Sequence, residues 1–376
     1  MPGTTREWPE WREYSELDKS SVGDTAFIEA MQSIISEYGE EALRKSWLET
    51  CERLSDITDE IASSGTDYIP VFESESILKN GFSTKEALRF RKVGCCIVRD
   101  VIPEKDAKQL YRDLETYIAD NKSKISGWPA ESPSMLLLYN SPTQIAIRTH
   151  KNHLKLQRIM NEVWHGYSDD TSPEPLLYTD GIRNRPPKQA FLGLGPHIDA
   201  GSLARWADPN YRKVYEHIFS GNPDLHDCYN LEVRKTADQY MFPGAGHSTI
   251  FRSFQGWTAL SRSAPSEGGI MLYPNVATAI AYVLLRPFFN PPKNEAEIMN
   301  AAKWTFNNRT PWFPGTFKEQ SQFLSPSSHP HLRLKECLMN LPTMKAGDTV
   351  WWHTDVRSTN PFSYYQKLTT SVVPCS

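Results

Sequence analysis

The sequence predicts a mixed α and β protein that is mainly β, namely a double-stranded β-helix (a cupin-like jelly roll) with an N-terminal helical extension and flanking helices. From about residue 175 onward, short apolar runs alternate with Pro, Gly and Asn, which is typical of many short strands closed into a double-sheet roll. The 27 Pro residues also argue against an all-helical bundle, because Pro breaks helix interiors.

The N-terminal part of the chain has the apolar spacing of helices. Apolar side chains recur at helical intervals over residues 27–35, after Asp24 as a candidate N-cap, and again over residues 43–61. Ser63-Ser64-Gly65 ends the second run. We interpret residues 1–85 as a helical extension and residues 86–376 as the β-helix domain. Truncation of the C-terminal end is one interpretation of this domain.

The strands and one further helix are predicted from shorter patterns. Pro103 suits the first turn of a helix whose inner face falls within residues 107–118. Short apolar runs bounded by turn residues predict buried strands. These runs are residues 94–98, 190–194, 269–274 and 349–353.

Composition excludes several classes of function. The net charge is -4, from 41 basic and 45 acidic residues, so no basic excess draws the chain to nucleic acid or to an anionic membrane. The most apolar stretch, residues 277–289, is interrupted by Arg286 and is too short to span a bilayer. Six Cys without a CxxC pair, and an N-terminus without an apolar signal core, predict a cytoplasmic protein with reduced thiols. The oligomeric state is not predicted.

One short motif has the residue types of an iron site. His197 and Asp199 lie two apart, so on a strand both side chains share a face and aim into one cavity. With a second His from a distant strand they would form a two-histidine-one-carboxylate triad, which leaves positions open for co-substrate and oxygen. Spacing alone does not select this motif, because His353-Thr354-Asp355 and His329-Pro330-His331 are also present. An isolated His-x-Asp is ordinarily a surface loop pair.

Longer blocks of sequence support the first motif. The chain reads FLGLGPHIDAGSLARW from Phe191, FRSFQGWTALSRSAPSEGGIMLYPN from Phe251, and KAGDTVWWHTD from Lys345. In this order the blocks resemble an uncharacterised, mainly fungal and bacterial family typified by YbiU-like proteins, which looks like a branch of the iron(II)/2-oxoglutarate oxygenases near the phytanoyl-CoA dioxygenases. The resemblance covers roughly residues 85–355. It implies that His197 and Asp199 bind iron(II), and that Arg205 and residues 251–257 line or support the pocket.

The chain departs from the family pattern at the third ligand. The family's Gly-Asp-x-Val-x-Trp-His-x-Asp motif is followed, a few residues on, by a second His, which looks like the usual iron ligand. Here no His follows His353. Either His353 takes over as the third ligand, or that ligand is missing.

The basic residue that would anchor 2-oxoglutarate is also open. An Arg or Lys is expected, because it gives a charge-assisted bond to a carboxylate in a dry pocket. The candidates are Arg205, Arg252, Arg357 and Lys367. Arg205 is equally interpretable as a structural ion pair, and Arg252 as part of a packed sheet.

The function predicted is an iron(II)/2-oxoglutarate-dependent dioxygenase. It would oxidise a C–H bond of a small, amino-acid-like or secondary metabolite with O2, and release succinate and CO2. One alternative is an inactive jelly roll that lost its distal iron ligand and acts as a binding module, or is a truncated product. Another is a cupin-type enzyme that uses the metal without 2-oxoglutarate.

Overall fold

The computed structural model describes most of the chain. The described residues are 8–15, 23–176, 180–185, 193–199, 201–244, 249, 251–265 and 267–359, together with the backbone of residues 370–375. Helices hold more residues than strands in these ranges. The predicted mixture of helices and strands is confirmed, whereas the strands hold fewer residues than a mainly β chain implies. The closed roll stays a prediction.

The larger sheet has eight strands in the described residues. The central strand β13 is antiparallel to both of its neighbours, β2 and β7, and is buried along its whole length. Both faces of the sheet are therefore covered at its centre. The strand order is β1 (Val71–Glu73), β2 (Cys95–Arg99), β13 (Thr349–His353), β7 (Phe254–Ala259), β15 (Thr370–Cys375), β5 (Ile182–Arg185), β4 (Met135–Leu136) and β3 (Gly127–Trp128).

A smaller sheet carries the first His-x-Asp motif. Its five strands, counted within the described ranges, are β11 (Gln322–Phe323), β6 (His197–Ile198), β14 (Ser358–Thr359), β8 (Met271–Leu272) and β12 (Met339–Asn340). A separate pair joins β9 (Phe289–Asn290) to β10 (Thr305–Phe306). Residues 354–357 connect β13 of the larger sheet directly to β14 of the smaller one. This short connection ties the two sheets together.

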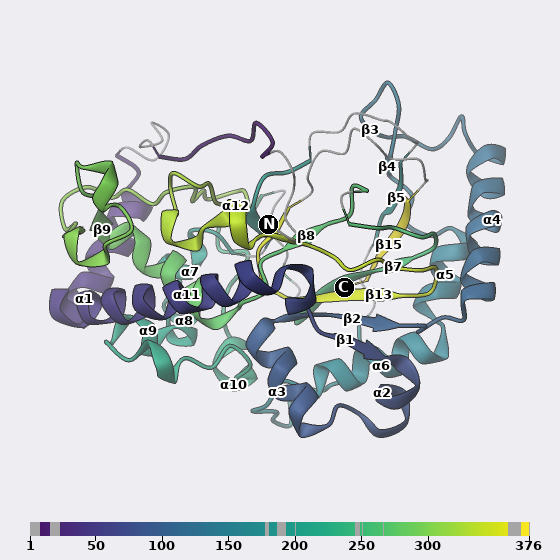
Figure 1. Cartoon of the computed structure of the whole chain (residues 1–376), viewed down its shortest axis with the longest axis horizontal. Helices are drawn as coiled ribbons and strands as arrows, with labels where there is room; N and C mark the ends of the chain where they lie inside the picture. Colours follow the sequence, from purple (N-terminus) through teal and green to yellow (C-terminus); the bar gives the residue numbers. More distant parts are fainter. Residues whose placement is uncertain are drawn as a thin grey trace.

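Helices surround the sheets. Figure 1 shows α1 beside α11, α7 and α9 at one end of the molecule, and α2, α5 and α6 at the other end near the larger sheet. The helices of the described part are α1 (Thr25–Ser64), α2 (Ser74–Asn80), α3 (Thr84–Val93), α4 (Glu104–Asp120), α5 (Pro142–Arg148), α6 (Lys151–Asn161), α7 (Ala204–Ala207), α8 (Pro209–Val214), α9 (Glu216–Phe219), α10 (Leu231–Arg234), α11 (Ala277–Leu285) and α12 (Leu334–Cys337). None of them combines the length and apolar character needed to cross a bilayer.

The two apolar runs predicted near the N-terminus form one element, α1. Asp24 accepts a hydrogen bond from the backbone of Ala26, which confirms the predicted N-cap. A kink at Gly39, where φ is 80°, divides the helix where the sequence divides the two runs. The apolar stripe of α1 belongs to the same hydrophobic cluster as residues of β2 and β13. The helical extension and the larger sheet thus share one core.

Other predicted elements differ in how far they extend. Residues 94–98 and 349–353 form β2 and β13 as predicted, and the predicted helical face lies on α4 after Pro103. The run at 269–274 contributes only the two-residue strand β8, although its side chains are buried. In the run at 190–194, residues 190–192 lie outside the described residues.

Gly347 forms the turn that precedes β13. Its φ is 96°, and a Cβ there would overlap the backbone oxygen of Ile102. We expect Gly347→Ala to lower the free energy of unfolding by at least about 2 kcal/mol, because strain and overlap add. Gly39→Ala is the control, since Gly39 also has a positive φ but open space around its Cβ position, and we expect about 1 kcal/mol. Urea unfolding measures both, and equal losses would contradict the role of the overlap.

Candidate functional site

His197 lies on β6 with its ring fixed by the chain around it. The side chain is 4% exposed. Its Nδ1 is 2.7 Å from the carbonyl oxygen of Gly195, and since a carbonyl only accepts, Nδ1 carries the hydrogen and donates. Nε2 then faces the Oδ1 atom of Asp199 at 3.0 Å. The structure thus brings together the two residues that the sequence predicted to share a face.

Asp199 is held as a carboxylate at this position. Burial raises its pKa, but the charges of His197 and Arg252, with a smaller polar contribution from Gln255, outweigh burial, so the pKa lies below its ordinary value. Burial likewise lowers the pKa of His197, and Asp199 reverses this, so that pKa is raised. Gln255 belongs to β7, so the pair lies between the two sheets. The Asp199 side chain is 26% exposed, which leaves one side of the pair open.

Arg252 is the predicted anchor that lies with this pair. Its Nη1 donates to the Oε1 atom of Gln255 at 3.4 Å, and its charge acts on Asp199. The sequence offered sheet packing as one interpretation of Arg252, and it missed the electrostatic effect of Arg252 and Gln255 on Asp199. This effect depends on the register of β7 against β13. Gln255 pairs with Trp352 and Phe254 pairs with His353, and neighbouring side chains on a strand point to opposite faces, so Gln255 and Phe254 lie on opposite sides of the sheet.

His353 points to the opposite side of the larger sheet. It pairs with Phe254 and stacks on Trp164, with ring centroids 4.8 Å apart. Its Nε2 donates to the carbonyl oxygen of Cys228 at 3.2 Å, and its Nδ1 accepts from the backbone of Asp355 at 3.0 Å. Burial lowers the pKa of His353 to about 3. Both ring nitrogens are thus in use as part of the core.

The structure therefore does not bring His353 to the His197–Asp199 pair. In the described part of the chain, no group of three His, Cys, Asp or Glu side chains could hold a metal ion. The physical reason lies in strand geometry, because side chains alternate between the two faces of a sheet and His353 occupies the wrong one. The prediction of His353 as third ligand finds no support in its position.

Asp355 and two arginines form a buried ion cluster. Arg205 on α7 contacts Asp355 Oδ1 at 3.2 Å, and Arg234 on α10 contacts Asp355 Oδ2 at 2.6 Å. Tyr215 donates its hydroxyl to the same carboxylate at 3.2 Å. Despite burial, the arginines hold the pKa of Asp355 far below its ordinary range. Arg205 is thus engaged in a structural ion pair with Asp355. The sequence had favoured this interpretation and a 2-oxoglutarate anchor equally.

Arg357 is buried beside this cluster without a hydrogen-bond partner. It is completely buried, its guanidinium lies 5.6 Å from the ring centroid of Tyr273, and none of its three side-chain nitrogens has a partner among the described residues. Burial lowers its pKa to about 10, so it stays charged at neutral pH. Arg357 lies on the side of β14 away from His197, and Lys367 lies outside the described residues.

The third histidine motif is also part of the core. His329 Nδ1 lies 2.7 Å from the hydroxyl of Ser328, and His331 Nδ1 lies 3.1 Å from the hydroxyl of Tyr282. Burial lowers the pKa of both imidazoles, so both stay neutral. Neither histidine contributes to the site around His197.

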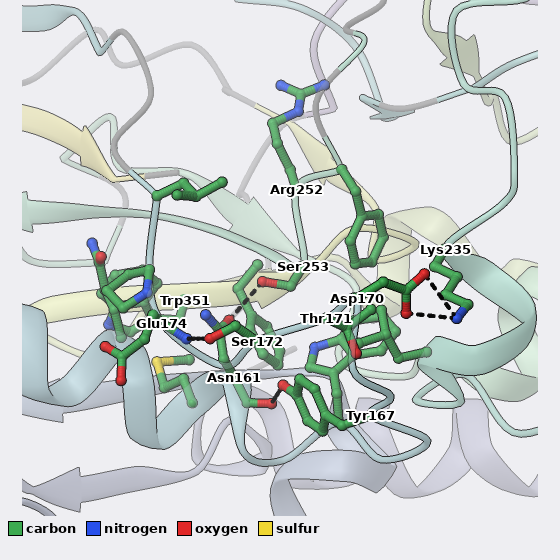
Figure 2. Close-up of a pocket in the computed structure, with 18 residues that line it drawn as sticks. Asn161, Tyr167, Asp170, Thr171, Ser172, Glu174, Lys235, Arg252, Ser253 and Trp351 are labelled. Carbon is green, nitrogen blue, oxygen red and sulfur yellow. Dashed lines mark hydrogen bonds and ion pairs between the residues drawn. The ribbon is translucent and has the colours of Figure 1, made fainter.

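A cavity of about 480 Å³ opens on the face of the larger sheet that carries His353. Its floor includes Trp164, Phe254 and Trp351, and Lys235 and Asp170 form an ion pair of 2.9 Å at one end. Figure 2 shows the Arg252 side chain extending away from the floor of this cavity. Arg252 thus lines the cavity and also acts by its charge on Asp199.

The comparisons with known proteins agree with the family resemblance. The family model described as Gig2-like matches residues 22–372. The uncharacterised protein YbiU of Escherichia coli (strain K12) is 29% identical over 310 residues, which are 79% of this chain and 69% of that protein. The crystal structure of GlcNAc Inducible Gene 2 from Candida albicans is 26% identical with a TM-score of 0.81, and covers 93% of this chain and 75% of that chain.

A bacterial structure shares the fold at lower identity. A Salmonella typhimurium LT2 protein, provisionally named an oxidoreductase, is 23% identical with a TM-score of 0.79 over 100% of this chain and 86% of that chain. At this identity the likeness concerns the fold alone.

The ion cluster predicts opposite effects for two matched substitutions. We expect Arg357→Met to raise the free energy of unfolding by about 1–4 kcal/mol, because it removes a buried cation that has no hydrogen-bond partner among the described residues. Arg234→Met should instead lower it by about 3–5 kcal/mol, because Asp355 loses its shorter ion pair. Thermal and urea unfolding measure both, and a loss of stability in Arg357→Met would contradict this account.

His353 predicts a loss of stability in acid. Its folded pKa of about 3 lies below the ordinary His value of about 6.5, so the unfolded chain takes up the proton first. Stability from this group is present above about pH 6.5 and is lost as the pH falls toward 3. In His353→Gln, the slope of unfolding free energy against pH between 4 and 6 should fall by about 1.4 kcal/mol per pH unit. An unchanged slope would mean that His353 is not buried as a neutral ring.

Proposed function

The chain belongs to the Gig2-like family, and from this premise we propose that it is an oxidoreductase of the iron(II)/2-oxoglutarate-dependent oxygenase type. The observation that carries the proposal is the contact between the buried His197 and the partly exposed Asp199, which lie between two sheets. The substrate proposed is a small metabolite that loses a C–H bond, with succinate and CO2 released. When bound, iron with 2-oxoglutarate and oxygen supplies the oxidising power for this chemistry.

The surroundings of the pair support metal binding. The Gly195 carbonyl accepts a hydrogen bond from Nδ1 of His197, so Nε2, which faces Asp199, is the nitrogen that would bind a metal in exchange for its proton. The charge of Arg252 and the polar side chain of Gln255 favour the charged form of Asp199, which is the form that ligates. We propose Arg252 as the residue that binds a carboxylate of 2-oxoglutarate, since its charge already reaches this side of the site.

The fit to iron is nevertheless incomplete. A facial triad needs three protein ligands, and the described residues bring two together. This favours a second candidate function, a roll that binds a small acid without turnover. The two candidates differ in whether iron and 2-oxoglutarate bind together at His197 and Asp199.

Three features of the wider chain stay proposals. We propose that the two sheets close into a double-stranded β-helix and that residues 1–85 act as its helical extension. We further propose a cytoplasmic enzyme whose partners are a small-molecule substrate, 2-oxoglutarate and O2.

An anaerobic titration of the metal-free protein with iron(II) and 2-oxoglutarate tests the proposal. We expect a visible metal-to-ligand charge-transfer band that His197→Ala and Asp199→Ala abolish. Arg252→Gln should weaken 2-oxoglutarate binding by about 10–100-fold, because a charge-assisted bond is lost. His353→Gln is the control and should keep the band. No band in the folded protein would favour the non-catalytic candidate.

A further inference from the structure

The strand beside His197 brings one particular residue next to the site. β14 is antiparallel to β6, and Ser358 is the residue directly opposite His197. Directly opposed residues in antiparallel strands point to the same face, with Cβ atoms about 4.5–5.5 Å apart. Ser358 is 3% exposed, so its side chain is enclosed beside the imidazole.

The residues directly before and after Ser358 face away from His197. Arg357 places its guanidinium near the ring of Tyr273, and Thr359 donates its hydroxyl to the carbonyl oxygen of Leu194 at 2.8 Å. Alternation along the strand explains both directions. Ser358 is therefore the residue of β14 that shares a face with His197 and Asp199.

Within the described sheet, the other residues paired with His197 and Ser358 carry no metal-binding group. Phe323 on β11 is the second residue opposite His197, and Leu272 on β8 is the second residue opposite Ser358. Both side chains are hydrocarbon. Residues 197, 199 and 358 are thus three positions on one face, of which the first two carry metal-binding groups.

We infer that Ser358 occupies the third-ligand position of this site, and that its hydroxyl leaves the site incomplete for iron(II). The inference rests on the proposed function, because it concerns the same pair of ligands. A neutral hydroxyl is a poorer donor to a divalent iron than an imidazole, which suits iron well. The chain as it stands binds a divalent metal weakly, and Ser358→His supplies the missing nitrogen.

The test is a titration of the metal-free chain with cobalt(II) alone. Calorimetry and visible absorption measure cobalt binding. We expect Ser358→His to bind cobalt more than about 100-fold tighter than the wild type, since even supporting residues around a metal change affinity by about 10–100-fold. Ser358→Leu is the matched control, with added bulk and no donor atom, and should show no gain. His197→Ala combined with Ser358→His should remove the gain.

Folding is followed by thermal unfolding without metal, and Ser358→Asp serves as a second, smaller ligand if the histidine variant does not fold. Folded Ser358→His and Ser358→Asp that bind cobalt no better than the wild type would overturn the inference. A wild type that binds tightly, and equally in Ser358→Leu, would also overturn it while the proposed function stands. A wild type without detectable binding, next to a tight Ser358→His, would support the inference and remove the metal-dependent function of the natural chain.

Discussion

The buried ion pairs of Asp355 with Arg205 and Arg234 are the interaction on which the rest of the structure depends. Asp355 lies in the four-residue connection between β13 and β14, and it is held by Arg205 from α7 and Arg234 from α10. A charged carboxylate is stable in the core only when it is paired with a cation. The connection must therefore place Asp355 beside the two arginines, which leaves it few alternative positions. Because only two residues separate Asp355 from the start of β14, the fixed position of Asp355 restricts how β14 can shift against β6, where Ser358 lies opposite His197.

The chain contains two His-x-Asp motifs with opposite roles, and strand alternation explains the difference. In the first, His197 and Asp199 contact each other between the sheets and keep one side open. In the second, His353 stacks in the core while Asp355 pairs with two arginines. The residue types are the same, but the second pair has no face toward the site. His353 serves packing of the core, and Asp355 neutralises buried arginines.

Much of the local structure could be predicted from the sequence. Apolar spacing and Asp24 predict α1, and the apolar runs at 94–98 and 349–353 predict the strands β2 and β13. Local patterns work here because helix capping and burial act between residues close in sequence. The run at 269–274 was less informative, since its short strand β8 exists only through pairing with β12 and β14.

The sequence by itself determined the family, the mixture of helices and strands, and the two residues, His197 and Asp199, that the structure brings together at the candidate site. It determined these because they depend on residue types at short spacing. Only the tertiary structure decided that His353 belongs to the core, that Arg205 serves Asp355, and that Ser358 is the residue beside His197. These facts depend on strand register, and register follows from pairing between segments more than a hundred residues apart, for which a single sequence carries no direct signal.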